Sequence, residues 1–404
     1  MWPCKGFDFS WEDWSFGLES SISPPRRQTV RARVERLWSE EGDAIACLTA
    51  RSAFDLFLRS RQWDEGDEII FSAVTVPDMP RLARHHGLST VPLDIDPMTT
   101  AWDIADLEAL IGPNTRAVVL THLYGARLDI EPAVEVARRH GVLVIEDCAE
   151  AYAGPKWTGH AGADVSLFSF GPLKTATAIG GGLIRVRDAE LRECMHSTLD
   201  SDPVQPTSEH LRRLFNYGAL KVSSTPHLFG MFIAVLEELG VDYQEVIHKL
   251  TRSVSPADLL TRIRRQPCAA LLALLERRLE QGDDGVARRT ELGRSLFDAL
   301  GPEVELPTRN ADLHAYWLVP VLMREPEVLA RILLGEGFYP MSGRLEVVAD
   351  NNAPDTISPG AERLVAESVY LSFDPQMPAC ELERLARIVT AAASKTPEGS
   401  RPSP

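Results

Sequence analysis

Cysteine is scarce and scattered in this chain of 404 residues. No Cys-x-x-Cys pair occurs, and the cysteines form no cluster with the ligand spacing of a structural metal site. We therefore expect reduced thiols in a cytoplasmic protein, and no metal site. The six cysteines are Cys4, Cys47, Cys148, Cys194, Cys268 and Cys380.

Long apolar runs and basic charge are also in short supply. No apolar run is long enough to span a bilayer, and residues 1–5 lack the apolar core of a signal peptide. Asp and Glu outnumber Lys and Arg by 58 to 42, which gives a net charge of -16. Such a charge disfavours polyanions, so we expect neither nucleic acid nor membrane as a partner. A small phosphate-bearing ligand stays open, because local donors decide its binding.

What the sequence does contain is a regular alternation of short apolar runs and amphipathic stretches. The pattern predicts strands at 44–48, 67–71, 90–94, 116–121, 142–147 and 183–186. Between them it predicts helices at 28–41, 49–63, 77–86, 104–111 and 130–140. This alternation predicts an α/β fold with a mostly parallel sheet. No Gly-x-Gly-x-x-Gly follows the first strand, which argues against a dinucleotide-binding dehydrogenase.

The composition changes on either side of this region, which suggests a division into domains. We expect an irregular N-terminal arm at 1–28, a large α/β domain at 29–195 and a helical connector at 196–268, with a loop at 199–208 and two helices within 210–240. We expect a smaller α+β C-terminal domain at 269–394, opened by one long helix at 269–300 and containing a strand at 315–322. Residues 395–404 are rich in Pro, Ser and Lys and are expected to be a disordered tail.

The most informative stretch lies between residues 142 and 182. Its apolar strand ends at Asp147, and ligands of α/β sheets sit at the carboxyl ends of the strands. Lys174 follows a Phe-Ser-Phe-Gly-Pro-Leu segment and precedes three glycines. An isolated lysine is more often a surface residue, and an isolated aspartate a turn residue. Together they suit pyridoxal 5'-phosphate (PLP), where the lysine forms a Schiff base and the acid keeps the pyridine nitrogen protonated.

Hydroxyl residues accompany this pair. Thr49, Arg51 and Ser52 open a predicted helix, whose N-terminus would suit a phosphate; the alternative is a simple N-cap at Thr49. Ser169 stands five residues before Lys174 and is either a phosphate ligand or a hydroxyl of the sheet.

Six segments in this order resemble the DegT/StrS-type sugar aminotransferases, a family of fold-type I PLP-dependent enzymes. They are 49–53 (Thr-Ala-Arg-Ser-Ala), 66–70 (Gly-Asp-Glu-Ile-Ile), 91–96 (Val-Pro-Leu-Asp-Ile-Asp), 122–125 (His-Leu-Tyr-Gly), 146–150 (Glu-Asp-Cys-Ala-Glu) and 168–174 (Phe-Ser-Phe-Gly-Pro-Leu-Lys). The resemblance covers residues 30–190 and continues more weakly to about 392.

The resemblance implies a role for individual residues. Lys174 resembles the Schiff-base lysine, Asp147 the partner of the pyridine nitrogen, Ala149 the small residue under the ring, and Ser169, Arg51 and Ser52 the phosphate ligands. Ala50, Arg51 and Thr175 depart from the residues usual in the family, and so do two positions expected beside the ring. Val76 stands where an aromatic residue usually stacks on the ring, and Glu150 stands where Gln or His usually approaches the phenolic oxygen.

By resemblance, the chain is expected to move an amino group from an amino acid, glutamate first, to a keto-sugar, nucleotide-linked or related. A homodimer is expected, with sites at the interface. The cluster of Arg262, Arg264 and Arg265 could then reach a neighbouring phosphate, or could be a solvated basic run. Two alternatives stay open: another PLP reaction such as dehydration or C–C cleavage, and a non-catalytic binding or regulatory protein of the same fold.

Overall fold

The computed structural model describes residues 1–241, 258–281, 284–341 and 345–395. The expected disordered tail therefore lies, apart from its first residue, outside the described residues.

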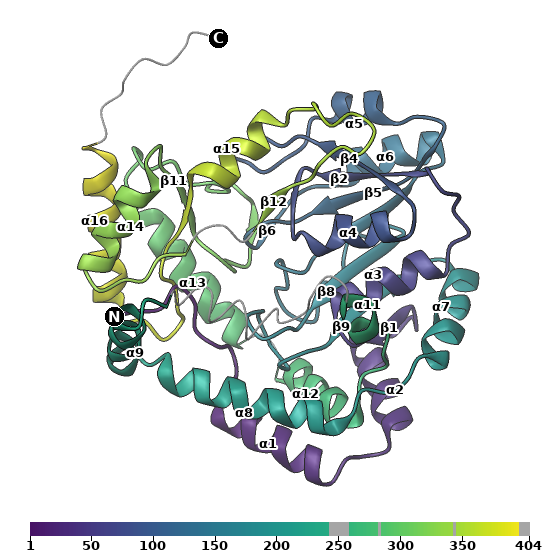
Figure 1. The fold of residues 1–404 in the computed structure, drawn as a ribbon, viewed down its shortest axis with the longest axis horizontal. Coiled ribbons are helices and arrows are strands. Elements are labelled where there is room, and N and C mark those ends of the chain that lie inside the picture. Colours follow the sequence, from purple (N-terminus) through teal and green to yellow (C-terminus); the bar gives the residue numbers. More distant parts are fainter. Residues whose placement is uncertain (242–257, 282–283, 342–344, 396–404) are drawn as a thin grey trace.

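A seven-stranded sheet forms the centre of the large α/β part (Figure 1). Its strand order is β1-β9-β8-β7-β5-β2-β4. The five strands from β4 to β8 in this order are parallel, while β9 runs antiparallel to both of its neighbours. The strands are β1 (Ala44–Cys47), β2 (Glu68–Ser72), β4 (Ser89–Leu93), β5 (Thr115–Thr121), β7 (Leu143–Asp147), β8 (Val165–Ser169) and β9 (Gly182–Val186). The predicted, mostly parallel sheet is confirmed.

Helices cover both faces of the sheet, because the strands are apolar on both sides. In β2, Ile69 and Phe71 belong to one hydrophobic core, and Ile70 between them belongs to the core on the opposite face. The helices are α2 (Arg27–Trp38), α3 (Ala50–Arg59), α4 (Asp78–His85), α5 (Ile104–Leu110), α6 (Glu131–His140) and α7 (Ala189–Ser201). Gly141 ends α6 in the left-handed conformation (φ 69°) and turns the chain into β7.

A smaller α+β part follows, with its own hydrophobic core. Its elements are β10 (Leu313–His314), β11 (Pro320–Leu322), β12 (Glu346–Val347), β13 (Ser368–Tyr370), α13 (Asp284–Ala299), α14 (Pro326–Gly335), α15 (Pro359–Glu367) and α16 (Ala379–Ala393). Two short antiparallel pairs connect this part to the large one. β10 pairs with β6 (Ala126–Arg127), and β12 pairs with β3 (Val74–Thr75).

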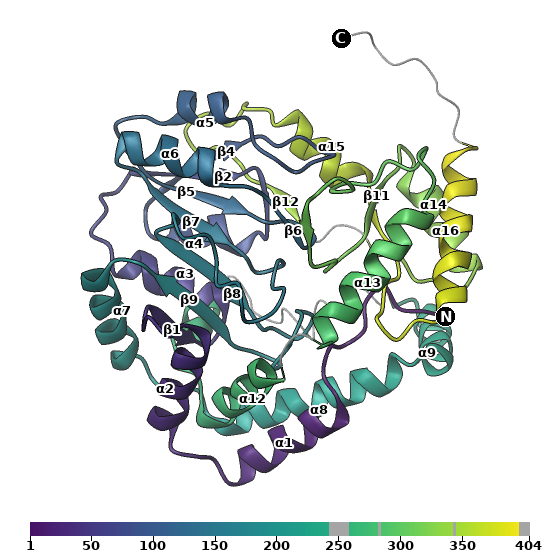
Figure 2. The same ribbon diagram turned by 180° about the vertical axis from the view of Figure 1, so that it is seen from behind.

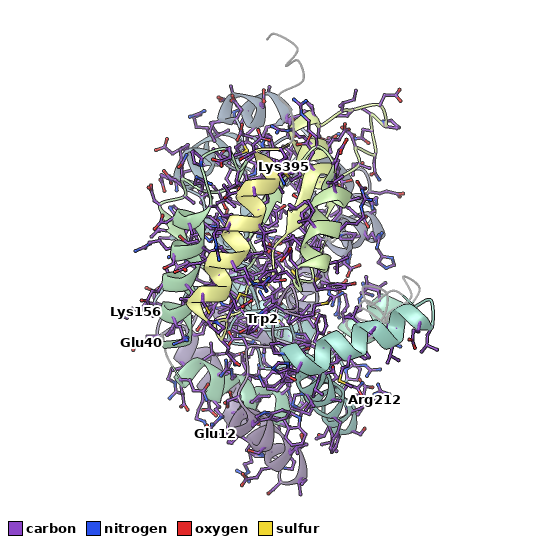
Figure 3. All side chains as sticks on the ribbon, turned by 90° about the vertical axis from the view of Figure 1, so that its left-hand side faces the viewer. Trp2, Glu12, Glu40, Lys156, Arg212 and Lys395 are labelled. Atoms are coloured by element: carbon purple, nitrogen blue, oxygen red, sulfur yellow. The ribbon has the colours of Figure 1, made fainter. Side chains whose placement is uncertain are left out.

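A third group of helices packs along one side of the molecule (Figure 2). α1 (Trp11–Ile22) contacts α8 (Thr207–Ser223) and α12 (Ala269–Glu280), while α9 (Pro226–Glu238) continues from α8 and α11 (Leu259–Ile263) contacts α3. The N-terminus reaches the smaller part, where the indole of Trp2 donates to Glu381 of α16 over 3.2 Å (Figure 3). In the described part of the chain, no single helix has the length and apolarity to cross a bilayer; only the sharply bent pair α8–α9 meets that test jointly.

Three local predictions were wrong. The arm is not irregular throughout, because Ser10 and Asp13 form a capping box that starts α1. The loop at 199–208 shrinks to residues 202–206 between α7 and α8. The long helix at 269–300 consists of two helices, α12 and α13, on either side of residue 281 and the undescribed residues 282–283.

The strand expected at 315–322 is also shorter than predicted. Only its last three residues belong to a strand, and Tyr316 has a positive φ of 48°, which breaks an extended run. The proposed division into domains stays a prediction.

Candidate active site

Lys174 lies in a turn just beyond β8, with its amine inside the protein. The turn is closed by the backbone N–H of Lys174, which donates to the carbonyl of Gly171 over 2.9 Å. The side chain is 17% exposed, and its Nζ lies 3.5 Å from Oε1 of Glu150. Nζ also lies 3.9 Å from the centre of the Trp317 ring. A carboxylate and an aromatic face therefore both favour a positive charge on this amine.

Asp147 stands at the carboxyl end of β7 and is buried. Its Oδ1 accepts the backbone N–H of Ala149 over 3.0 Å. Burial raises the pKa of Asp147, while the Ala149 N–H and the charge of Lys174 act in the opposite direction. A buried carboxylate in this position is stabilised by a cationic hydrogen-bond donor.

Glu150 is buried and points to donors of the protein itself. Its Oε2 accepts the backbone N–H of Tyr124 over 3.0 Å, and its Oε1 faces Lys174. Tyr124 and Gly125 both have positive φ angles, 61° and 102°. A Cβ on Gly125 would lie 2.7 Å from the backbone nitrogen of Trp317, so this turn requires glycine. The turn thus brings Glu150, Lys174 and Trp317 together.

Ser169 and the start of α3 share one corner of the sheet. Ser169 of β8 is paired with Gly182 of β9, and Gly182 is paired with Cys47 of β1. A Cβ on Gly182 would lie 2.4 Å from the carbonyl carbon of Thr49, so the backbone of β9 runs directly against the helix start. Thr49 caps the helix by accepting the N–H of Ser52 over 3.0 Å. The other N–H groups of the first turn have no partner within the helix and can serve an anion.

Arginines surround this corner. Arg51 pairs with Asp78 of α4, with 2.5 Å between Nη1 and Oδ2. Burial lowers the pKa of Arg213 in α8, and the charge of Arg51 lowers it further, which indicates that the two cations are close. Sequence reasoning missed Arg213, because an arginine on an amphipathic helix usually faces solvent.

Two of the expected ring contacts are less defined. Ala149 is partly exposed two residues after Asp147, as a small residue beneath a planar ligand would be. Val76 is partly buried and packs against the hydrophobic cores on both faces of the sheet. Its contact with a cofactor ring stays a prediction.

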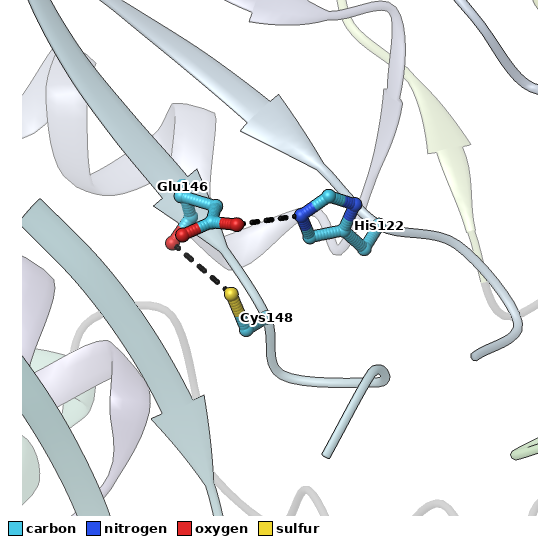
Figure 4. Close-up of side chains that lie close together, drawn as sticks. All are labelled: His122, Glu146 and Cys148. Carbon is cyan, nitrogen blue, oxygen red and sulfur yellow. Dashed lines mark hydrogen bonds and ion pairs between the residues drawn. The ribbon is translucent and has the colours of Figure 1, made fainter. Parts of the chain in front are cut away.

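A buried hydrogen-bond network lies behind Asp147 (Figure 4). His122 Nε2 lies 2.9 Å from Oε1 of Glu146, and His122 Nδ1 accepts the N–H of Leu128 over 3.1 Å. Since Nδ1 accepts, Nε2 carries the proton and donates to Glu146. Cys148 lies beside this pair, and the three side chains could in principle surround a metal ion. With Nε2 acting as a donor, we interpret the group as a hydrogen-bond network.

Two further residues at the site come from distant parts of the chain. Trp317 belongs to the smaller part, and its Nε1 donates to the carbonyl of Leu173 over 2.9 Å. Lys5 belongs to the N-terminal arm and is buried; its Nζ donates to the Trp317 carbonyl over 2.7 Å and lies 4.2 Å from the ring centre. Burial lowers the pKa of Lys5 well below its usual value, and the charges of Arg289 and Lys174 add to the effect. No sequence pattern marked either residue.

The basic cluster near residue 264 is engaged within the chain. Arg264 donates two hydrogen bonds of 3.0 Å to Asp55, and Arg265 pairs with Glu209 over 2.7 Å. This part of the structure therefore favours a structural role for Arg264 and Arg265.

Comparison with known proteins gives this arrangement its context. The profile of the DegT/DnrJ/EryC1/StrS aminotransferase family matches residues 33–217, from α2 into α8. The chain belongs to this family. Solved structures agree on the fold: the sugar aminotransferase CalS13 from Micromonospora echinospora superimposes with a TM-score of 0.71 over 97% of this chain and 100% of that chain, at 20% identity.

Relatives of this aminotransferase-family chain are similar over shorter stretches. A segment of 152 residues is 42% identical to the GDP-perosamine synthase of Caulobacter vibrioides, covering 37% of this chain and 40% of that protein. A longer segment of 306 residues is 30% identical to the L-glutamine:2-deoxy-scyllo-inosose aminotransferase of Streptomyces kanamyceticus, covering 71% and 66%. These two alignments thus leave a third or more of each of the two relatives unmatched.

The residues of the site fit PLP. Asp147 offers a buried carboxylate, which a cationic hydrogen-bond donor on the ligand would stabilise. The start of α3 offers N–H groups at the corner of the sheet that contains Ser169. Lys174 offers a partly buried amine whose charge acts on Asp147. Within the described part of the chain, the hydroxyl of Thr175 is buried without a hydrogen-bond partner, which leaves one more donor for a ligand.

Proposed function

We propose that this chain is a PLP-dependent aminotransferase that moves an amino group from an amino acid, glutamate first, to a keto-sugar or a related cyclic ketone. The observation that carries the proposal is the partly buried Lys174 amine, held by Glu150 and Trp317 near the carboxyl end of β7, where Asp147 stands. Family membership supports the reaction type. The two relatives differ in their named products and acceptors, so the acceptor is proposed only as a class.

The residues of the chain would divide the work as follows. Bound PLP supplies a conjugated ring that accepts electrons from the reacting carbon. Asp147 would hold the proton on the ring nitrogen. Lys174 Nζ would take the proton from the α-carbon of the donor and, in the half-reaction with the acceptor, return a proton to the acceptor's reacting carbon. Glu150 keeps Lys174 Nζ at 3.5 Å, and the Trp317 ring covers it from water. Ser169, Ser52 and Arg51, with Arg213, would hold the phosphate.

The test is covalent trapping. Purified protein is mixed with PLP, reduced with borohydride and digested, and the modified peptide is identified by mass spectrometry. We expect the pyridoxyl group on Lys174, and a visible absorbance band that bleaches when glutamate is added before reduction. Lys174→Ala should lose the adduct and the glutamate response.

Lys156→Ala is the matched control, since Lys156 is an exposed lysine in the loop before β8 (Figure 3). It should behave like the unaltered protein. An adduct elsewhere, or one that survives Lys174→Ala, would refute the lysine assignment. No band after addition of PLP would favour the non-catalytic alternative, and a band without amino transfer to any keto-sugar tested would favour another PLP reaction.

We also propose a homodimer in the cytoplasm, with no nucleic acid or membrane partner. Exposed apolar side chains support the dimer. Met231, Val235 and Leu239 stand four residues apart, in and just after α9, and are 68%, 52% and 69% exposed. A second copy would cover this surface. Sedimentation of the purified chain tests it, and a monomer at micromolar concentration would contradict it.

A further inference from the structure

A cavity of about 270 Å³ opens beside the loop that carries Lys174. Residues 6–10 of the N-terminal arm form one wall, the end of α12 and the start of α13 form a second, and residues 374–376 form a third. Ala176, two residues after Lys174, also lines it. The cavity therefore borders the proposed active site on the side of the arm.

Arg289 of α13 is the unusual group in this lining. It is 2% exposed, and among the described residues its Nε and Nη1 are buried without a hydrogen-bond partner. Nη2 has only a distant ion pair, 3.8 Å from Oδ2 of Asp8. A buried guanidinium with two unused donors is costly unless an anion completes it.

The neighbouring arginine shows the contrast. Arg278 also lines the cavity, but it donates to Asp13 over 2.8 Å and to the Asp8 carbonyl over 2.8 Å. Asp8 is similarly occupied, because its Oδ2 accepts the N–H of Ala176 over 2.9 Å. Among the described residues, Arg278 keeps one buried donor without a partner, its Nε, whereas Arg289 keeps two, Nε and Nη1. Arg289 therefore has the larger capacity to bind a ligand.

The cavity is electrostatically coupled to the reacting lysine. Lys5 stands on the arm just before the cavity wall, and both Arg289 and Lys174 act on its charge. Both ammonium groups, of Lys5 and of Lys174, face the Trp317 ring within 4.2 Å of its centre. A negative group bound at Arg289 would therefore lie near the site but separate from the atoms that react.

The charges of the lining decide which anion fits. Asp8 and Asp374 lie in the same cavity as Arg289 and Arg278, so a doubly charged phosphate would be repelled more strongly than a single carboxylate. A carboxylate on a short aliphatic chain matches both the volume and the charge. The proposed reaction supplies such a molecule.

We propose that Arg289 binds the side-chain carboxylate of the amino donor, so that this site selects glutamate over glutamine. The inference rests on the proposed aminotransferase function for its biological meaning. Its binding step can be tested separately.

The first experiment measures binding of glutarate by calorimetry, using full-length protein without PLP, so that catalysis is not involved. We expect glutarate to bind, and we expect the part of inorganic phosphate binding that depends on Arg289 to be at least tenfold weaker. Arg289→Met should weaken glutarate binding about ten- to hundredfold, as loss of a charged hydrogen bond does, while Arg289→Lys should retain part of it. Equal binding of glutarate to the Arg289→Met variant, or phosphate binding that is tighter than glutarate binding and is lost in that variant, would overturn the proposal.

The second experiment compares kcat/KM for glutamate and glutamine in the PLP-loaded protein. Arg289→Met should reduce the glutamate value about ten- to hundredfold and leave the glutamine value nearly unchanged. Arg387→Met is the control, because Arg387 is an exposed arginine on α16 and does not line the cavity. An equal loss for both donors would mean a structural role only. Glutarate binding without amino transfer would instead refute the proposed function and leave the anion site standing.

Discussion

Glu146 offers the sharpest test of the network behind Asp147. Its carboxylate is 1% exposed and accepts three hydrogen bonds, from His122 Nε2 over 2.9 Å, from the N–H of His160 over 2.8 Å and from the hydroxyl of Ser166 over 2.8 Å. Burial alone would raise its pKa, but these donors outweigh burial and lower the pKa from 4.5 to about 2. That difference corresponds to roughly 3 kcal/mol of stability at neutral pH.

The perturbation is Glu146→Gln, which keeps the shape and removes the charge. The single carbonyl oxygen of Gln cannot satisfy all three donors, and its amide group would face one of them. We expect a loss of about 2–4 kcal/mol in the free energy of unfolding at pH 7, measured by urea unfolding with circular dichroism.

The pH dependence follows from the lowered pKa. The contribution of Glu146 is fully present above pH 4.5 and is lost as the pH falls toward 2. The difference between the two proteins should therefore shrink by roughly half at pH 3.

Glu131→Gln is the control, because the carboxylate of Glu131 is half exposed and meets only the side chain of His160, at 3.3 Å. It should change stability by less than about 0.5 kcal/mol. The network does not stabilise the fold as reasoned if the free energy of unfolding of Glu146→Gln lies within about 0.5 kcal/mol of that of the unaltered protein. The same conclusion follows if the difference between the two proteins does not shrink in acid.

Three further changes test other parts of the structure. Gly182→Ala places a methyl group against the backbone of Thr49, so it should cost at least about 2 kcal/mol and weaken PLP binding in a titration; unchanged affinity would separate β9 from the phosphate site. Asp13 accepts from Arg277 and Arg278, and although burial opposes it, their charges help to lower its pKa to about 2. Asp13→Asn should therefore cost about 3 kcal/mol in urea unfolding at pH 7, with the cost declining below pH 3.8; no change would mean that α1 is held by apolar contacts alone. A thiol reagent should modify Cys194 and Cys380 quickly in the folded protein and the four buried cysteines only after unfolding, and rapid reaction of a third thiol would contradict the packing.

Six of the seven strands of the large sheet could be predicted from the sequence because their signals are local, whereas β8 was not predicted. Each strand is a short apolar run, and Gly141 marks the end of the helix before β7. Asp147 could be predicted for the same reason, since it ends such a run, whereas Lys174 was indicated by its place between a Phe-Ser-Phe-Gly-Pro-Leu segment and three glycines. Their mutual approach required only the rule that ligands sit at the carboxyl ends of parallel strands.

The rest of the site could not be predicted, because it depends on contacts between distant segments. Trp317 reaches Lys174 across more than 140 residues, and Lys5 reaches Trp317 across 312. No periodicity in either segment records such a contact. The helix α1 is a different case. The capping box of Ser10 and Asp13 was a local signal that could have corrected the prediction of an irregular N-terminal arm.

The position of Trp317 also turns the indole into an optical reporter. Its ring lies 3.9 Å from the Lys174 amine and 4.2 Å from the Lys5 amine, so its emission responds to the charge of both groups. A pyridoxal ring attached at Lys174 would absorb light where indole emits. The difference in fluorescence between the unaltered protein and Trp317→Phe is the signal of Trp317. This signal would therefore report cofactor loading in real time, from a residue in the smaller part of the chain.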